Sequence, residues 1–246
     1  MISYFNINYE FDKPTVWKMI DEQLQKDGAR YICVADGNII QMVHKDLDYR
    51  KVVNGSLFTI CDSSWATVIL KKLYGTQYQP YCGSQIFEDL TGKRQYRQFF
   101  IGTSEKVLEG LKTELTKKDL AIGGMSFFAP PFCKAEDFDY PAIAEMINND
   151  HPDIVWVALG APKQEYFMYR LQPFLKRGVM IGVGAVFNFY CGLENAPKRA
   201  PQWMVKLHLE FLYRVFTEPG KQLKRCKDFL VTLPKIYKEE KRRAKS

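Results

Sequence analysis

The strongest constraint on the fold is an alternation between short apolar runs and segments with helical periodicity. Runs such as 30–35 (RYICVA) and 153–159 (DIVWVAL) have the length of buried strands, and helical patterns separate them. This alternation predicts an α/β fold with a mostly parallel sheet and helices on both faces. The predicted strands are 3–8, 30–35, 57–61, 97–101, 119–123, 153–159 and 178–183, and the predicted helices are 14–27, 38–53, 64–75, 104–117, 140–149 and 162–176.

The pattern changes after Gly192, beyond which the sequence predicts helices only. A break at 195–197 is followed by helical patterns at about 198–216 and 219–230 and by a Lys/Arg-rich end. In the first of these, Trp203 and Leu207 begin a series of apolar residues at helical spacing, so the helix is amphipathic. We therefore expect a core over 1–195 and a helical appendage over 196–246.

Positive charge is concentrated in this appendage. The formal net charge of the chain is +7, but the segment from Lys198 to the end holds 14 Lys and Arg against 5 Asp and Glu, whereas the remainder holds 21 against 23. Such asymmetry indicates a polyanionic partner, which could be a membrane surface, phosphate groups or nucleic acid. The amphipathic placement of the basic residues favours an anionic membrane over nucleic acid.

Composition argues against several other classes of protein. The sequence has no apolar run long enough for a membrane span and no recognisable leader, so we expect a cytoplasmic protein. The 6 cysteines form no CxxC pair and the 3 histidines lie far apart, so we expect no metal cluster, disulfide framework or cofactor. Asp46 with Asp48, and Asp137 with Asp139, are better explained as solvated surface, although a metal-dependent transferase using Asp137 and Asp139 stays an alternative.

Candidate site residues follow the predicted strands, because ligands bind at the carboxyl ends of parallel strands. Asp62 follows 57–61 and Asp36 follows 30–35. Each could cap the next helix, or could act as a general base on a hydroxyl group within reach. The sequence leaves both explanations open.

The strand at 153–159 runs directly into Gly160-Ala161-Pro162-Lys163-Gln164-Glu165. The glycine allows close approach of a ligand, and the following helix N-terminus offers amide donors to an anion. Gln164 either binds a polar substrate group or belongs to a solvated first helical turn. Gly184 and Asn188 follow the last predicted strand, where an incomplete GxG pattern is only a weak signal.

Three stretches, ALGAPKQEYFM, IGVGAVFNFYCG and KRAPQWMVKLHLEFLYRVFTEPGKQLKR, follow one another with short spacings. Together they resemble the WecG/TagA/CpsF family of bacterial glycosyltransferases, whose pattern is Gly-x-Pro-Lys-Gln-Glu, then Val-Gly-x-x-Phe-Asp-Phe-x-x-Gly, then Arg-Ala-Pro-x-Trp followed by Leu-Glu-Trp-x-x-Arg and Glu-Pro. Each piece alone is weak, but the combination is specific. A weaker similarity in NIIQMVHKDLDYRKVVNGSLFTICDSSWATVILKKLYG extends the resemblance over nearly the whole chain.

This resemblance implies a Rossmann-like core and a C-terminal appendage that docks on the membrane and helps to close the site. It implies inverting, metal-independent transfer of a sugar from a UDP-sugar to a polyprenyl-diphosphate-linked sugar acceptor. The setting is bacterial surface polysaccharide biosynthesis, such as capsule or exopolysaccharide, at the inner face of the cell membrane. Assembly into a homo-oligomer is left open.

On the family pattern, Asp62 takes the position of the proposed catalytic base and Gln164 that of a glutamine in the substrate pocket. Basic residues of the appendage match positions suited to contact with a diphosphate, whose charge needs stabilisation as it leaves. The substrate-binding residues expected from the strand ends and the resemblance together are Asp36, Gly160, Lys163, Gln164, Glu165, Gly184, Asn188, Arg199, Arg214 and Arg225, with Lys221 as a further candidate.

The chain also departs from the family pattern around the expected sugar pocket. Departures are Val34-Ala35-Asp36 in place of Thr-x-Asn, Ser63 in place of Gly after Asp62, Pro80 or Tyr81 in place of Arg, Gln85 in place of Asp, and Asn188 in place of Asp. They leave the donor sugar open. They also leave an alternative, a non-catalytic protein with a basic tail that binds a nucleotide-sugar or nucleic acid.

Overall fold

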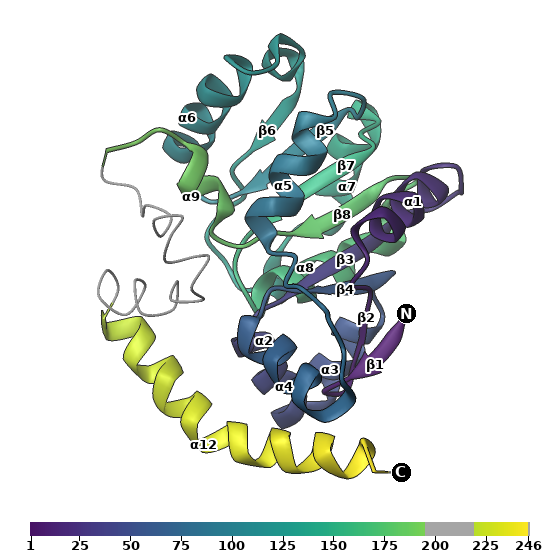
Figure 1. Cartoon of the computed structure of the whole chain (residues 1–246). Helices are drawn as coiled ribbons and strands as arrows, with labels where there is room; N and C mark the ends of the chain where they lie inside the picture. The colour runs from purple at the N-terminus through teal and green to yellow at the C-terminus, as the bar shows by residue number, and fades with distance from the viewer. Residues whose placement is uncertain (195–218, 246) are drawn as a thin grey trace.

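The computed structural model describes residues 1–194 and 219–245 (Figure 1). Its centre is an eight-stranded sheet of order β1-β2-β4-β3-β8-β7-β5-β6, in which β1 and β2 pair antiparallel and every other neighbouring pair is parallel. The mostly parallel sheet predicted from the sequence is confirmed. The strands are β1 Ile2–Tyr4, β2 Ile7–Tyr9, β3 Arg30–Ala35, β4 Phe58–Cys61, β5 Gln98–Gly102, β6 Ser126–Phe128, β7 Ile154–Ala158 and β8 Val179–Gly182.

Helices cover both faces of this sheet. The central strands are buried on both sides, so alternate residues of one strand enter two different apolar layers. In β7, Val155 and Val157 belong to the apolar layer that includes residues of α2, α3, α4, α7 and α8, whereas Trp156 belongs to the layer that includes residues of α1, α5, α6 and α9. The α-helices are α1 Lys13–Leu24, α2 Gly37–Lys45, α3 Leu47–Asn54, α4 Ser64–Tyr74, α5 Gly83–Gly92, α6 Glu105–Thr116, α7 Tyr140–Asp150, α8 Lys163–Leu171, α9 Val186–Tyr190 and α12 Pro219–Arg243, and the 3-10 helices are η1 Leu120–Gly124, η2 Ala135–Asp137 and η3 Gln172–Phe174.

The predicted bounds of the five central strands agree with β3, β4, β5, β7 and β8 to within one residue at each end. The predicted strand 3–8 is instead a hairpin. Phe5 and Asn6 have positive φ values of 51° and 63°, which reverse the chain between β1 and β2. The predicted helix 38–53 is interrupted at Asp46, whose extended backbone ends α2 and whose side chain caps α3.

The predicted strand 119–123 is wrong. Asp119 accepts a hydrogen bond from Ala121 N at 3.1 Å and starts η1, and β6 begins only at Ser126. An Asx turn of this kind competes with strand pairing, and the short apolar run gives no warning of it. The sequence pattern also does not predict α5 or α9.

The C-terminal helix α12 is longer than the predicted helix 219–230 and continues to Arg243. Its last turns pack on the core, since Ile236 is fully buried in the layer that contains α2 and α4, and Glu240 is 1% exposed. The predicted helix 198–216 lies outside the described residues. The division into a core over 1–195 and an all-helical appendage over 196–246 therefore stays a prediction.

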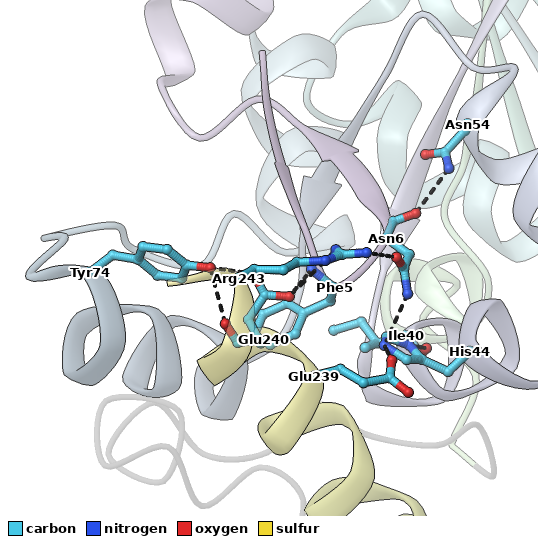
Figure 2. A network of polar contacts seen from close by, with 9 residues as sticks. All are labelled: Phe5, Asn6, Ile40, His44, Asn54, Tyr74, Glu239, Glu240 and Arg243. Carbon is cyan, nitrogen blue, oxygen red and sulfur yellow. Dashed lines mark hydrogen bonds and ion pairs between the residues drawn. The ribbon is translucent and has the colours of Figure 1, made fainter. Parts of the chain in front are cut away.

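A buried carboxylate holds the end of α12 against the N-terminal hairpin (Figure 2). Glu240 accepts hydrogen bonds from Phe5 N at 2.8 Å and from the Tyr74 hydroxyl group at 2.7 Å, and Arg243 lies 3.8 Å from it. Arg243 also donates to the Asn6 side chain. The two left-handed residues of the hairpin turn thus present one backbone donor and one side-chain acceptor to α12.

His44, at the end of α2, completes this contact. Burial lowers the pKa of His44 below its usual value, and the hydrogen bond to Ile40 O and the nearby Glu239 only partly offset this effect. Its Nδ1 lies 2.9 Å from Ile40 O and its Nε2 lies 3.3 Å from Asn6 Nδ2, a geometry that suits a neutral ring with the proton on Nδ1. The 3.6 Å contact with Glu239 is then a polar contact rather than an ion pair.

Ile236→Ala tests the docking of α12. We expect the free energy of unfolding to fall by about 2–5 kcal/mol, as for other fully buried Ile→Ala changes. Val231, on the same helix, is 74% exposed and provides a control, since Val231→Ala should change stability by roughly 0.5 kcal/mol or less. Urea denaturation measures both variants. Equal, small effects would show that the end of α12 is not part of the core.

Candidate active site

The sheet order brings four strand ends together. Strands β4, β3, β8 and β7 are parallel neighbours, so the residues that follow them lie along one edge. Asp62 follows β4 and donates its backbone N–H to Ala35 O at 2.9 Å, next to Asp36. Beyond β8, Val183 N donates to Val157 O of β7 at 2.8 Å. Residues predicted from four separate stretches of sequence therefore share one edge of the sheet (Figure 1).

Asp62 lies at this edge beside the start of α5. The N-cap position of α4 is Ser63, one residue further on, and Asp62 Oδ2 accepts a hydrogen bond from Gly83 N at 3.3 Å. The N-terminus of a helix carries partial positive charge, which stabilises a nearby carboxylate. The Asp62 carboxylate, which is partly exposed, is thus oriented by α5, a helix that the sequence pattern does not predict. A role for Asp62 as a base stays a prediction.

Asp36 is the N-cap of α2. Its Oδ1 accepts hydrogen bonds from Asn38 N at 3.0 Å and from Ile39 N at 2.9 Å. The capping explanation left open by the sequence is confirmed for this residue. Because a carboxylate has about four acceptor sites, capping through one oxygen leaves capacity to bind a hydroxyl group.

Gln164 and Glu165, at the start of α8, are buried, with exposed fractions of 3% and 0%. Gln164 Oε1 accepts from Gly160 N at 3.2 Å and from Gly184 N at 3.0 Å, so it joins the turns that follow β7 and β8. Its Nε2 donates to Glu165 Oε1 at 2.8 Å, and the Tyr49 hydroxyl group donates to Glu165 Oε2 at 3.0 Å. The alternative that Gln164 belongs to a solvated first helical turn is therefore wrong.

Three further residues lie around this edge. Lys163 Nζ lies 5.3 Å from the ring centre of the exposed Phe132 and 4.9 Å from that of Phe138, which is a cation–π arrangement. Asn188 is partly exposed on α9. Gln85, which replaces an expected Asp, accepts from Cys82 N at 3.1 Å and so stabilises the first turn of α5.

Arg199 and Arg214 lie outside the described residues, and Arg225 belongs to α12 in a part whose side chains are not described. Tyr49 and the Gly83 amide also belong to the site, but sequence analysis missed them. They reach the site from α3 and α5 and do not directly follow a strand. For α5, the spacing of Ile86, Phe87 and Leu90 does fit a helix with one buried face.

The family of the chain follows from its match to a known family model. The model of the glycosyl transferase WecG/TagA/CpsF family matches residues 3–246. The chain belongs to the WecG/TagA/CpsF family.

Two curated relatives have the same name, N-acetylglucosaminyldiphosphoundecaprenol N-acetyl-beta-D-mannosaminyltransferase. The protein from Bacillus subtilis (strain 168) is 30% identical over 227 residues, which cover 88% of this chain and 82% of the relative. The protein from Bacillus spizizenii (strain ATCC 23059 / NRRL B-14472 / W23) is 27% identical over 230 residues, covering 90% and 84%. The similarity thus spans most of both relatives and includes all four strand ends.

Two properties of this family member can be stated for residues 1–194 and 219–245. Among the side chains that the structure describes, no group of three or more His, Cys, Asp or Glu could hold a metal ion, and Asp139 is used as the N-cap of α7. None of the helices in these ranges combines the length and the apolar character that a membrane span requires.

The buried Glu165 predicts a pH dependence of stability. Burial raises its pKa from 4.5 to about 7, although hydrogen bonds from Gln164 and Tyr49 oppose the change. The folded state therefore binds more protons than the unfolded state between these pH values, and the free energy of unfolding falls as pH rises through this window.

Glu165→Gln removes this titration. Relative to wild type, the variant should gain stability as pH rises from 4.5 to 7, by roughly 3 kcal/mol at most. Urea denaturation at several pH values measures the difference, and the wild type controls for all other titrating groups. Parallel curves for the two proteins would contradict the expected titration of Glu165.

Proposed function

We propose that this family member transfers a hexose or N-acetylhexosamine from a UDP-sugar to a sugar linked through diphosphate to a polyprenyl lipid, with inversion and without a catalytic metal. The observation that carries the proposal is the match over nearly the whole chain to this family, together with two relatives whose names specify a diphosphoundecaprenol-linked acceptor. The placement of Asp62 at the shared strand edge supports it.

In the proposed reaction, Asp62 takes the proton from a hydroxyl group of the acceptor sugar. The oxygen attacks the anomeric carbon of the donor from the side opposite to UDP, and the bond between that carbon and the UDP oxygen breaks. UDP leaves with the bonding electrons, so the configuration inverts. The hydrogen bond from Gly83 N orients the base, as general-base catalysis requires.

Charge on the departing UDP needs stabilisation. The N-terminus of α8, at Lys163, supplies partial positive charge from the helix and a cation at the strand edge. We assign the remaining contacts to Arg199, Arg214 and Arg225 of the C-terminal segment, because arginine binds phosphate oxygens with paired donors. Asp36 and Asn188 would bind hydroxyl groups of the donor sugar.

A lipid-linked acceptor also explains the basic C-terminal segment. We propose that the enzyme works from the cytoplasm as a peripheral protein on the inner face of the cell membrane, within surface polysaccharide biosynthesis. Each Lys or Arg close to an anionic leaflet adds about 1 kcal/mol to binding. The 14 basic residues after Pro197 outnumber 5 acidic ones, which suits this role.

The Asp62→Asn variant tests the base. With a panel of UDP-sugars, a synthetic lipid-diphosphate-sugar acceptor and EDTA present, wild type should be active, and the variant should lose about a hundredfold or more in kcat. The exposed Asp27 provides a matched control, because Asp27→Asn should retain full activity. Full activity in Asp62→Asn would refute this residue as the base.

The same assay separates the alternatives. Loss of wild-type transfer in EDTA would favour a metal-dependent enzyme using Asp137 and Asp139. UDP binding without transfer for any donor and acceptor would favour a binding protein.

Substitution of three lysines of α12 tests membrane binding. Changing Lys221, Lys224 and Lys227 to Gln should weaken flotation with anionic vesicles by about 3 kcal/mol, close to a hundredfold in the partition coefficient. The matched control changes the exposed Lys18, Lys26 and Lys106 to Gln, which removes the same charge elsewhere. Equal losses in both triple variants would show that charge alone, rather than α12, determines binding.

A further inference from the structure

The side chain of Gln164 is fixed by groups of the protein itself. Its Oε1 faces two backbone N–H groups, those of Gly160 and Gly184. Because an N–H group needs an acceptor opposite it, the amide oxygen must lie on this side and Nε2 on the other. The orientation of Gln164 therefore follows from the chemistry of its neighbours.

Glu165 completes this orientation. It accepts from Gln164 Nε2 through one oxygen and from the Tyr49 hydroxyl group through the other, at 2.8 Å and 3.0 Å. Tyr49 is 1% exposed, so the three side chains form a buried chain of hydrogen bonds from α3 to the strand edge. Among the described ion pairs none involves Glu165, so hydrogen bonds from Gln164, from Tyr49 and from its own backbone N–H satisfy this buried carboxylate.

The backbone around Gln164 is shaped to admit its side chain. A Cβ atom on Gly182 would lie 2.8 Å from Met168 Cε and 3.1 Å from Gln164 Nε2, so glycine there lets both side chains lie against β8 without displacement. Gly160 and Gly184 have φ values of 76° and 60°, in the left-handed region that favours glycine. Their two turns therefore have little intrinsic preference for one conformation, and Gln164 supplies the link between them.

We infer that Tyr49 and Glu165 are positioning residues that act through Gln164 to hold the turns after β7 and β8 in one arrangement before the donor binds. This inference rests on the proposed function, and it places the donor against these two turns. A site that is already ordered loses less conformational entropy when substrate binds, and it aligns the reacting atoms better. Gln164 then acts on the substrate through the Gly160 and Gly184 turns.

Glu165→Met is the main test, because methionine keeps a similar volume and removes both acceptor oxygens without leaving a charge in the core. Glu165→Gln is the conservative variant, since its amide can accept from Gln164 Nε2 and donate to the Tyr49 oxygen. Tyr49→Phe removes a single donor. Glu145→Met, at an exposed position of α7, is the matched control.

The first measurement is amide hydrogen exchange at Gly160 and Gly184 in the full chain. In Glu165→Met we expect exchange at both glycines to accelerate about tenfold or more, because their acceptor is no longer fixed. Glu165→Gln should restore rates to within about threefold of wild type, and Tyr49→Phe should give an intermediate value. The inference is overturned if folded Glu165→Met shows wild-type exchange rates at both glycines. If only Tyr49→Phe folds, wild-type rates at both glycines in that variant overturn it.

The second measurement is steady-state transfer. Glu165→Met should lower kcat/KM for the UDP-sugar by about tenfold and change the KM of the lipid-linked acceptor by less than about threefold, and Glu165→Gln should recover most of the loss. Equal loss toward both substrates overturns the link to donor binding. If the wild-type protein shows no transfer, the proposed function is refuted. The positioning role is still tested, because the exchange rates do not depend on transfer.

Discussion

Parallel pairing of β4, β3, β8 and β7 is the constraint on which the site depends. In a parallel sheet every strand ends at the same edge, so segments that are distant in sequence meet there. Hydrogen bonds extend this order one residue past the strands, from Asp62 N to Ala35 O and from Val183 N to Val157 O. Helices on both faces bury these strands, so packing as well as hydrogen bonding sets the positions of their ends. The edge therefore consists of the ends of paired strands and of the loops that follow them, whose sequences are less constrained by the sheet.

The fold was predictable where burial on both faces imposes a continuous apolar run. Strand β7 is such a case, since its five residues are all buried and the run ends at the turn beginning with Gly160. Prediction failed where a single polar side chain decides the outcome. Asp46 divides one helical pattern into α2 and α3, and Asp119 turns an apolar stretch into a 3-10 helix. In each case the local capping bond outweighs a hydrophobic period that continues through it.

The site was predictable to the extent that its residues follow strands directly. Asp36, Asp62 and Gly160 could be named from sequence because the rule for strand ends is local. The role of Glu165 could not be predicted from sequence, because glutamate in the first turn of a helix is commonly solvated and favoured by the helix dipole. Its partner Tyr49 lies 116 residues away, so no local pattern links the two. In the assembled fold Glu165 is buried and accepts a hydrogen bond from Gln164, which joins the two turns.

The C-terminal helix α12 combines a buried end that belongs to the core with a basic end. Its last turns belong to the core through Ile236 and Glu240, whereas its first turns contribute Lys221, Lys224 and Arg225 to the basic segment. Both ends belong to one helix, which contains Pro234. Removal of everything after Pro197 would take away both properties, and Phe5 N and the Tyr74 hydroxyl group would lose the carboxylate that binds them. Lost transfer after such a truncation would therefore not distinguish a membrane contact from a damaged core, whereas charge substitutions that leave Ile236 and Glu240 in place would.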